Sequence, residues 1–166
     1  MTEAKEIAVR KQGGEVLQLV SFSVGQEEFG VDILKVREIN RMVEITRVPN
    51  ASEFVSGVIN LRGKVIPVID LRRRFGIGKK DNDKNTRIIV VELTGRVLGF
   101  VVDAVNAVLR IPRSVTEPPP PMVAGIGSEC ITAIGKLEDR LLILLDLERV
   151  LTIEEDVQLA ARKVHS

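Results

Sequence analysis

The chain repeats one pattern of apolar and polar residues, and this repeat limits the fold more than any other feature of the sequence. Residues 20–36, VSFSVGQEEFGVDILKV, match residues 89–105, IVVELTGRVLGFVVDAV, at an offset of 69. Residues 57–72, GVINLRGKVIPVIDLR, match residues 133–148, AIGKLEDRLLILLDLE, at an offset of 76. Alternating apolar and polar residues around short turns are typical of half-buried strands. We therefore expect two related β units.

The repeat also predicts how the chain divides. Short strands joined by Gly-containing turns favour small barrels. A unit of roughly 65 residues buries only about 60% of its unfolded surface, so two such units gain by packing together around a groove. The predicted segments are a flexible tail over 1–14, a first β barrel over 15–78, a linker over 79–84, a second β barrel over 85–152, and a C-terminal helix and tail over 153–166.

Two short helices are expected beside the strands. Asp32 is placed to cap a helix over Ile33–Ile39 in the first unit. Thr152 and Glu155 form a capping box at the start of the C-terminal helix, whose apolar spacing favours packing on a barrel. A basic stretch, Arg72–Arg74 followed by two lysines, is interleaved with aspartates and predicts a solvated loop.

Composition argues against several classes of function. Lys and Arg total 24 and Asp and Glu total 23, so the net charge is +1 and gives no strong attraction to nucleic acid or anionic lipid. Five Phe, no Trp and no Tyr leave few faces on which bases stack. The N-terminus lacks the apolar region of a signal peptide, and no apolar run approaches a membrane span. The sequence predicts a cytoplasmic protein without nucleic-acid partners or direct membrane insertion.

Side chains suited to catalysis or metal binding are scarce. The only histidine, His165, stands next to the C-terminus, and Cys130 heads an apolar strand where a small core residue is expected. Asp70 and Asp146 hold matching repeat positions, which predicts that each accepts backbone N–H bonds at a strand end. The run GVINLRGK, residues 57–64, lacks the spacing and the following helix of a phosphate loop. We expect no enzyme activity, no cofactor and no metal.

A polar turn interrupts the apolar strands of the first unit. Asn60, Arg62, Gly63 and Lys64 lie between two apolar runs, and glycine permits the positive φ that a tight hairpin often needs. Arg62 has two interpretations at this turn. It keeps the turn soluble, or it anchors an interface through its planar fork of donors.

Two binding functions remain open on the residues alone. Small barrels often bind oligonucleotides, although charge and composition argue against it here. The alternative is a small-molecule site in the groove between the units, lined by Ile33, Val36, Val102 and Val105.

Three runs of the chain are distinctive: FGVDILKVREI, GVINLRGKVIPVIDLRRRFG and GFVVDAVNAVLRI. Together they resemble the CheW family of bacterial chemotaxis coupling proteins, and the resemblance covers about Val16 to Leu151. It implies two SH3-like five-stranded β barrels side by side, in a scaffold that has no catalysis of its own. The implied partners are the cytoplasmic tips of methyl-accepting chemotaxis receptors and the regulatory domain of the histidine kinase CheA. We expect a protein that is monomeric when free and is recruited to membrane receptor arrays.

The resemblance also implies site residues. Receptor contact falls on the matching motif positions Val36, Gly57 and Arg62, and the neighbouring residues added to them are Ile33, Glu38 and Asn60. The predicted kinase contact is the apolar group Met42, Val43 and Ile45. The second repeat has Glu138–Asp139 where the first has Arg62–Gly63, so we expect the two ends of the molecule to bind different surfaces.

Overall fold

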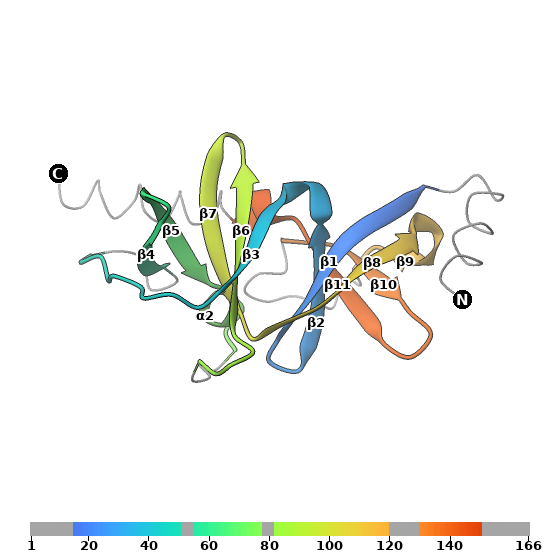
Figure 1. Cartoon of the computed structure of the whole chain (residues 1–166). Helices are drawn as coiled ribbons and strands as arrows, with labels where there is room; N and C mark the ends of the chain where they lie inside the picture. Colours follow the sequence, from blue (N-terminus) through green and yellow to red (C-terminus); the bar gives the residue numbers. More distant parts are fainter. Residues whose placement is uncertain (1–14, 51–54, 78–81, 120–129, 151–166) are drawn as a thin grey trace.

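The strands form two sheets that lie side by side (Figure 1). The computed structural model describes residues 15–50, 55–77, 82–119 and 130–150. Sheet A contains β1 (Val16–Val24), β2 (Glu27–Asp32), β8 (Ala104–Pro112), β9 (Thr116–Glu117), β10 (Ile131–Lys136) and β11 (Leu141–Leu145). Sheet B contains β3 (Val36–Arg41), β4 (Val55–Leu61), β5 (Lys64–Asp70), β6 (Arg87–Leu93) and β7 (Arg96–Val102). The predicted fold class, mainly β with two small SH3-like barrels, is confirmed.

Each sheet combines strands from both halves of the chain. The strand order is β8-β1-β2-β11-β10-β9 in sheet A and β3-β6-β7-β5-β4 in sheet B. In both, the first hairpin of one repeat lies between the third strand and the last two strands of the other repeat. Figure 1 shows the blue β1–β2 hairpin beside the orange β10–β11 hairpin. The prediction that 15–78 and 85–152 form separate barrels is therefore wrong, because the two halves exchange hairpins.

The strand register confirms the duplication residue by residue. Pairs of facing residues in the first repeat recur at the predicted offsets in the second. Examples are Phe22 opposite Phe29 with Val91 opposite Leu98, and Ile59 opposite Ile66 with Gly135 opposite Leu142. The parallel pairs between repeats also match, with Gly30 beside Leu144 and Gly99 beside Val68. Both copies carry the same backbone pairing scheme.

The largest hydrophobic core is shared by the two sheets. Alternate residues of the central strands enter it, including Val20, Phe22, Phe29, Ile89, Leu98 and Phe100. Cys130 is fully buried in this core, as predicted. The remaining buried hydrophobic residues of the described chain form one smaller core in each sheet: Leu19, Ile111, Leu142 and Leu144 in sheet A, and Ile59, Ile66, Val68, Ile88, Val90 and Val101 in sheet B.

Two short helical turns follow aspartate caps. Asp32 Oδ1 accepts a hydrogen bond from Leu34 N at 2.9 Å, but the turn it caps is the three-residue 3₁₀ helix η1 (Ile33–Lys35). The prediction of a helix over Ile33–Ile39 is wrong because β3 begins at Val36, where alternate side chains become half-buried. The helix α2 (Leu71–Arg74), which the sequence did not predict, follows Asp70.

Asp70 and Asp146 have the structural role that their matching positions predicted. Asp70 Oδ1 accepts from Arg72 N at 3.0 Å, and Asp146 Oδ1 accepts from Glu148 N at 3.0 Å. The predicted tail over 1–14, the C-terminal helix over 153–166 and part of the linker lie outside the described residues. Within the described part of the chain, no helix has the length and apolarity required to cross a bilayer.

A buried arginine joins the two sheets. Arg72 and Arg74 are each only 2% exposed, so the prediction of a solvated loop is wrong for them. Arg72 Nε and Nη2 donate to the two carboxylate oxygens of Asp70 at 2.9 and 3.0 Å, and Nη1 lies 3.5 Å from Asp103 Oδ1. The other oxygen of Asp103 accepts from Gly25 N, in the β1–β2 turn, at 2.7 Å. This path runs from the end of sheet B to a turn of sheet A.

Replacing Arg72 by methionine is expected to destabilise the fold by about 3 kcal/mol or more, because Asp70 and Asp103 stay buried and lose the buried cation between them. Urea denaturation measures the change in unfolding free energy. Arg37 is the control, since its ion pair with Glu92 is half exposed and its loss should cost at most about 1 kcal/mol. Equal effects of the two substitutions would contradict a special role for the buried arginine.

Candidate partner-binding site

The polar turn between β4 and β5 has a strained and exposed backbone. Arg62 has φ +51° and Gly63 has φ +84°, as in the type I′ hairpin turn. The positive φ at glycine was expected, whereas the positive φ at arginine was not. Asn60 Oδ1 accepts a hydrogen bond from Gly63 N at 3.0 Å and holds the turn closed. The turn therefore presents the arginine from a fixed backbone.

The Arg62 side chain points outward and is paired. It is 73% exposed, which agrees with the predicted outward orientation, and its Nη2 donates to Glu38 Oε2 at 2.5 Å. The other oxygen of Glu38 accepts from Asn40 Nδ2 at 2.8 Å. Glu38 and Asn40 lie on β3, at the opposite edge of sheet B from β4. The ion pair thus joins the two ends of the sheet and fixes the position of the guanidinium.

This contact changes the ionisation of both partners. The hydrogen bond from Arg62, with a second one from Asn40, holds the pKa of Glu38 below its ordinary value. The same contact raises the pKa of Arg62. Because the pKa of Glu38 is lowered in the folded state, the ion pair contributes its full stabilisation of the fold at pH values above the ordinary glutamate pKa. It is lost as the pH falls through the lowered pKa.

A shallow hollow of about 240 Å³ adjoins the pair. It has cationic and apolar walls, and its lining residues are Arg37, Glu38, Leu61, Arg62, Lys64, Ile66, Val90 and Val97. Three cations beside aliphatic side chains favour a partner surface that is acidic and partly apolar.

Gly57 has a steric reason to be glycine. Its φ is +148°, and a Cβ at this position would lie 2.1 Å from the carbonyl oxygen of Thr46 and 2.9 Å from Ile45 Cγ2. The close approach arises because Thr46 and Val58 exchange two backbone hydrogen bonds of 2.9 and 2.8 Å. A substitution at Gly57 is therefore expected to displace the segment at Thr46, whether or not Gly57 itself contacts a partner.

The predicted kinase contact divides between core and surface. Met42 and Ile45 are half-buried and pack on the sheet B core, while Val43 is 41% exposed. Of the three residues, Val43 is the most exposed.

Ile33 and Val36 lie on a different part of the molecule. Both are half-buried and pack on the shared core. Val105 packs there too, and Val102 is fully buried, so the four residues do not line one common groove, although Ile33 by itself lines a pocket of sheet A. The small-molecule site predicted for them is therefore wrong in its location.

The six predicted receptor residues form three groups in the structure. Glu38, Asn60 and Arg62 meet at the turn, Gly57 lies under the segment at Thr46, and Ile33 and Val36 cover the shared core. Asn40, which orients Glu38, was not predicted from the sequence. Asn40 is two residues after Glu38, so in a strand both side chains lie on the same face. The incorrect helix prediction over Ile33–Ile39 hid this relation.

Comparison with known proteins decides the family. Residues 18–155 match the family model described as the CheW-like domain. The chain belongs to the CheW family. It is thus an adaptor of bacterial chemotaxis, as the resemblance in its motifs implied. Within its described residues, no group of three or more His, Cys, Asp or Glu is placed to hold a metal ion.

Similar proteins and a solved structure agree with this membership. The chain is 41% identical to chemotaxis protein CheW of Klebsiella aerogenes over 149 residues, which cover 89% of this chain and 90% of the relative. It is 36% identical to chemotaxis protein CheW of Helicobacter pylori over 149 residues, with 90% of each chain covered. The crystal structure of the scaffolding protein TtCheW from Thermoanaerobacter tengcongensis has 45% identity and a TM-score of 0.74, covering 80% of this chain and 90% of that one.

The second repeat of this CheW family member has a different turn. Arg140 pairs with Glu28 at 2.5 Å and with Asp139 at 2.8 Å, and Leu137 N bonds to the Arg140 carbonyl. Unlike Arg62 and Gly63, Glu138 and Asp139 are not among the residues with positive φ. The equivalent ends of the two sheets therefore differ in backbone shape as well as in charge.

Gly57→Ala is expected to destabilise this CheW family protein by about 2 kcal/mol or more, because the new Cβ overlaps the Thr46 carbonyl. Gly63→Ala is the control. Its φ is also positive, but a Cβ there meets nothing within 4 Å, so about 1 kcal/mol is expected. Chemical denaturation of both variants tests the difference. A smaller loss for Gly57→Ala than for Gly63→Ala would refute the steric explanation.

The carboxyl of Glu38 is expected to titrate below its ordinary pKa in the native protein. In Arg62→Gln the pKa should rise towards the ordinary value but stay slightly below it, because Asn40 still donates. Carbon-detected NMR of the glutamate carboxyls measures both values. An identical Glu38 titration in the two proteins would mean that the ion pair does not persist in solution.

Proposed function

We propose that this protein is a non-catalytic scaffold that couples methyl-accepting chemotaxis receptors to the histidine kinase CheA. Membership of the CheW family supports this proposal, as does the name of the related structure, a scaffolding protein. In this role the protein binds the cytoplasmic tips of the receptors and the regulatory domain of CheA. It is monomeric and cytoplasmic when free, and the receptors recruit it to arrays at the membrane.

The exposed and oriented Arg62 is the observation that carries the receptor half of the proposal. Glu38 and the turn hold its guanidinium in place before a partner arrives, which reduces the entropy lost on binding. A receptor carboxylate that reaches the neighbouring hollow shares the guanidinium with Glu38, because its planar fork of N–H groups donates to more than one anion. Arg62, Asn60 and Glu38 are the proposed contacts at this turn.

The other proposed receptor residues act in two ways. Ile33, in η1, and Val36, at the start of β3, contribute their exposed edges. Gly57 acts indirectly, since its missing side chain allows the segment at Thr46 to lie close to β4. A bulky residue at Gly57 is expected to disturb receptor binding through a changed backbone.

In this proposal CheA binds a different surface from the receptors. The segment after β3 presents Val43 outward, while Met42 and Ile45 hold the segment on the sheet B core. The two turns at the ends of the sheets differ in charge and backbone, which supports the use of different surfaces for different partners.

Arg62→Glu is expected to lower affinity for a receptor signalling fragment at least about thirtyfold, the loss typical of an arginine hot spot, because it reverses the charge offered to an acidic partner. Affinity for the CheA regulatory domain should change less than about threefold. Titration calorimetry against each partner measures both, with thermal melts to verify folding.

Two controls separate receptor contact from loss of the internal ion pair. Glu38→Gln breaks the same pair but leaves the arginine charge, so receptor affinity should fall by less than about threefold, far less than in Arg62→Glu. Glu138→Arg changes the equivalent position of the second repeat and should leave receptor binding nearly intact. If Glu38→Gln weakened receptor binding as much as Arg62→Glu, the pair would be structural and Arg62 would lose its proposed contact.

A further inference from the structure

Among the described strands, the chain passes twice from one sheet to the other. The first crossover is η1, which joins β2 of sheet A to β3 of sheet B. The second crossover is Asp103 alone, which joins β7 of sheet B to β8 of sheet A. The repeat makes the two crossovers equivalent, because Leu34 of η1 matches Asp103 at the offset of 69. Differences between them therefore show how the two copies of the fold are held together.

Each crossover is joined by an ion pair to the turn that follows the last strand of the other repeat. Asp103 pairs with Arg72 after β5, and Lys35 Nζ donates to Glu148 Oε1 after β11 at 3.0 Å. Arg72 and Glu148 match at the offset of 76. The backbone N–H of each donates to the matching aspartate of its own repeat. The two links are thus equivalent in the fold, with their charges reversed.

The two links differ in burial. The side chains of Arg72 and Asp103 are 3% and 9% exposed. Those of Lys35 and Glu148 are 43% and 45% exposed, so water and salt screen this pair and its loss costs far less than the loss of one partner of a buried pair. The backbone N of Asp103 also donates to the Ser23 carbonyl at 2.9 Å. The second crossover is therefore fixed, and the first is held more weakly.

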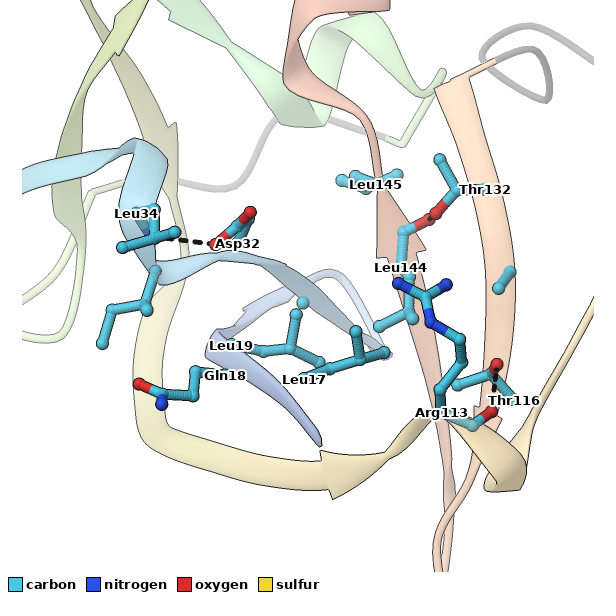
Figure 2. Close-up of a pocket in the computed structure, with 13 residues that line it drawn as sticks. Leu17, Gln18, Leu19, Asp32, Leu34, Arg113, Thr116, Thr132, Leu144 and Leu145 are labelled. Carbon is cyan, nitrogen blue, oxygen red and sulfur yellow. Dashed lines mark hydrogen bonds between the residues drawn. The ribbon is translucent and has the colours of Figure 1, made fainter. Parts of the chain in front are cut away.

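Open space adjoins the first crossover. None of its three residues is buried, and Leu34 is 88% exposed. Figure 2 shows Leu34 and Asp32 at a sheet A pocket of about 340 Å³. A second hollow, of about 200 Å³, is lined by both Lys35 and Glu148. An element beside two hollows loses few packing contacts when it shifts, so its position depends on a few polar links.

The charges around Lys35 favour the link to Glu148. The hydrogen bond and the charge of Glu148 raise the pKa of Lys35, and the charges of Asp32 and Asp146 act in the same direction. Asp32 belongs to the first repeat, whereas Glu148 and Asp146 belong to the second. The hydrogen-bonded partner of the lysine therefore lies on the other half of the chain.

We propose that the first crossover is the adjustable joint between the two sheets, and that Glu148 positions it through Lys35. The crossover contains Ile33 and leads directly into Val36, so its consequence for receptor contact rests on the proposed function. In that role Glu148 is a positioning residue, which acts on the receptor contacts without touching the receptor. A crossover held in one position before binding loses less entropy when a partner binds.

Amide hydrogen exchange of the full chain, followed by NMR, tests the joint without any partner. The reporters are the amide of Leu34, which donates to Asp32, and the amide of Val36, which donates to the Ile33 carbonyl. Both should have lower protection factors than the amide of Asp103 in the second crossover. Equal or higher protection at the first crossover would overturn its assignment as the joint.

Glu148→Met tests the positioning link, because methionine has a similar length but no charge. The protection factors of Leu34 and Val36 should fall about twofold to fivefold, the range expected for one exposed ion pair. That of Asp103 should not change. In a Lys35→Met background the same substitution should have no further effect, since the pair is already absent. An effect of equal size in both backgrounds would show that Glu148 does not act through Lys35.

Glu117→Met is the matched control. It breaks the pair between Lys136 and Glu117, whose atoms lie 2.6 Å apart and whose side chains are 55% and 61% exposed. Neither residue lines the hollow beside the first crossover. The protection of Leu34 and Val36 should therefore stay unchanged. A loss equal to that in Glu148→Met would mean that any lost surface pair loosens the crossover, which would overturn the role of Glu148.

Titration calorimetry against a receptor signalling fragment measures the consequence for binding. Glu148→Met should lower the affinity about twofold to fivefold, with no further loss in the Lys35→Met background. Unchanged affinity in a variant with a loosened crossover would overturn the link to receptor contact. If the unmodified protein does not bind the fragment, the proposed function is wrong, and the exchange measurements still decide whether Glu148 positions the joint.

Discussion

The structure depends on two parallel strand pairs that join the halves of the chain. β2 pairs with β11, and β5 with β7, and each contact passes over a glycine. At Gly99 an added Cβ would lie 2.7 Å from Ile88 Cγ2, and at Gly30 it would lie 3.2 Å from Leu142 Cδ2. Without these contacts neither sheet is complete. The site at the β4–β5 turn therefore rests on a sheet that needs both repeats.

The sequence predicted the duplication but not the exchange of hairpins, and the reason is physical. Local alternation specifies each hairpin and its register. The two repeats share that register, so the edge of β2 suits β5 as well as β11, and the pattern alone cannot assign the partner. Long-range contacts were also invisible for Arg72, which pairs with its neighbour Asp70 and also with Asp103 from another part of the chain. A run of three arginines therefore suggested a solvated loop, although two of the three are buried.

Features of the candidate site that follow from turn chemistry could be predicted from the sequence. Features that depend on contacts between distant strands could not. Asn60 and Gly63 are residues that tight turns require, and a polar side chain between them was expected to face outward. The partner of Arg62 depends on the sheet bringing β3 near the β4–β5 turn, which local sequence does not encode. Gly57 was chosen from a family motif, and the structure gives it a steric explanation in the Thr46 carbonyl.

The exchange of hairpins has a consequence for the history of the fold. Two separate chains, each holding one repeat, would reach these strand orders only as an intertwined homodimer in which each chain lends its first hairpin to the other. Joining the two copies in one chain turns that dimerisation into an internal step, at an effective concentration of about millimolar for a short linker. Fusion then frees the copies to diverge. An arginine turn on one sheet and an acidic turn on the other are forms of asymmetry that a homodimer could not have evolved.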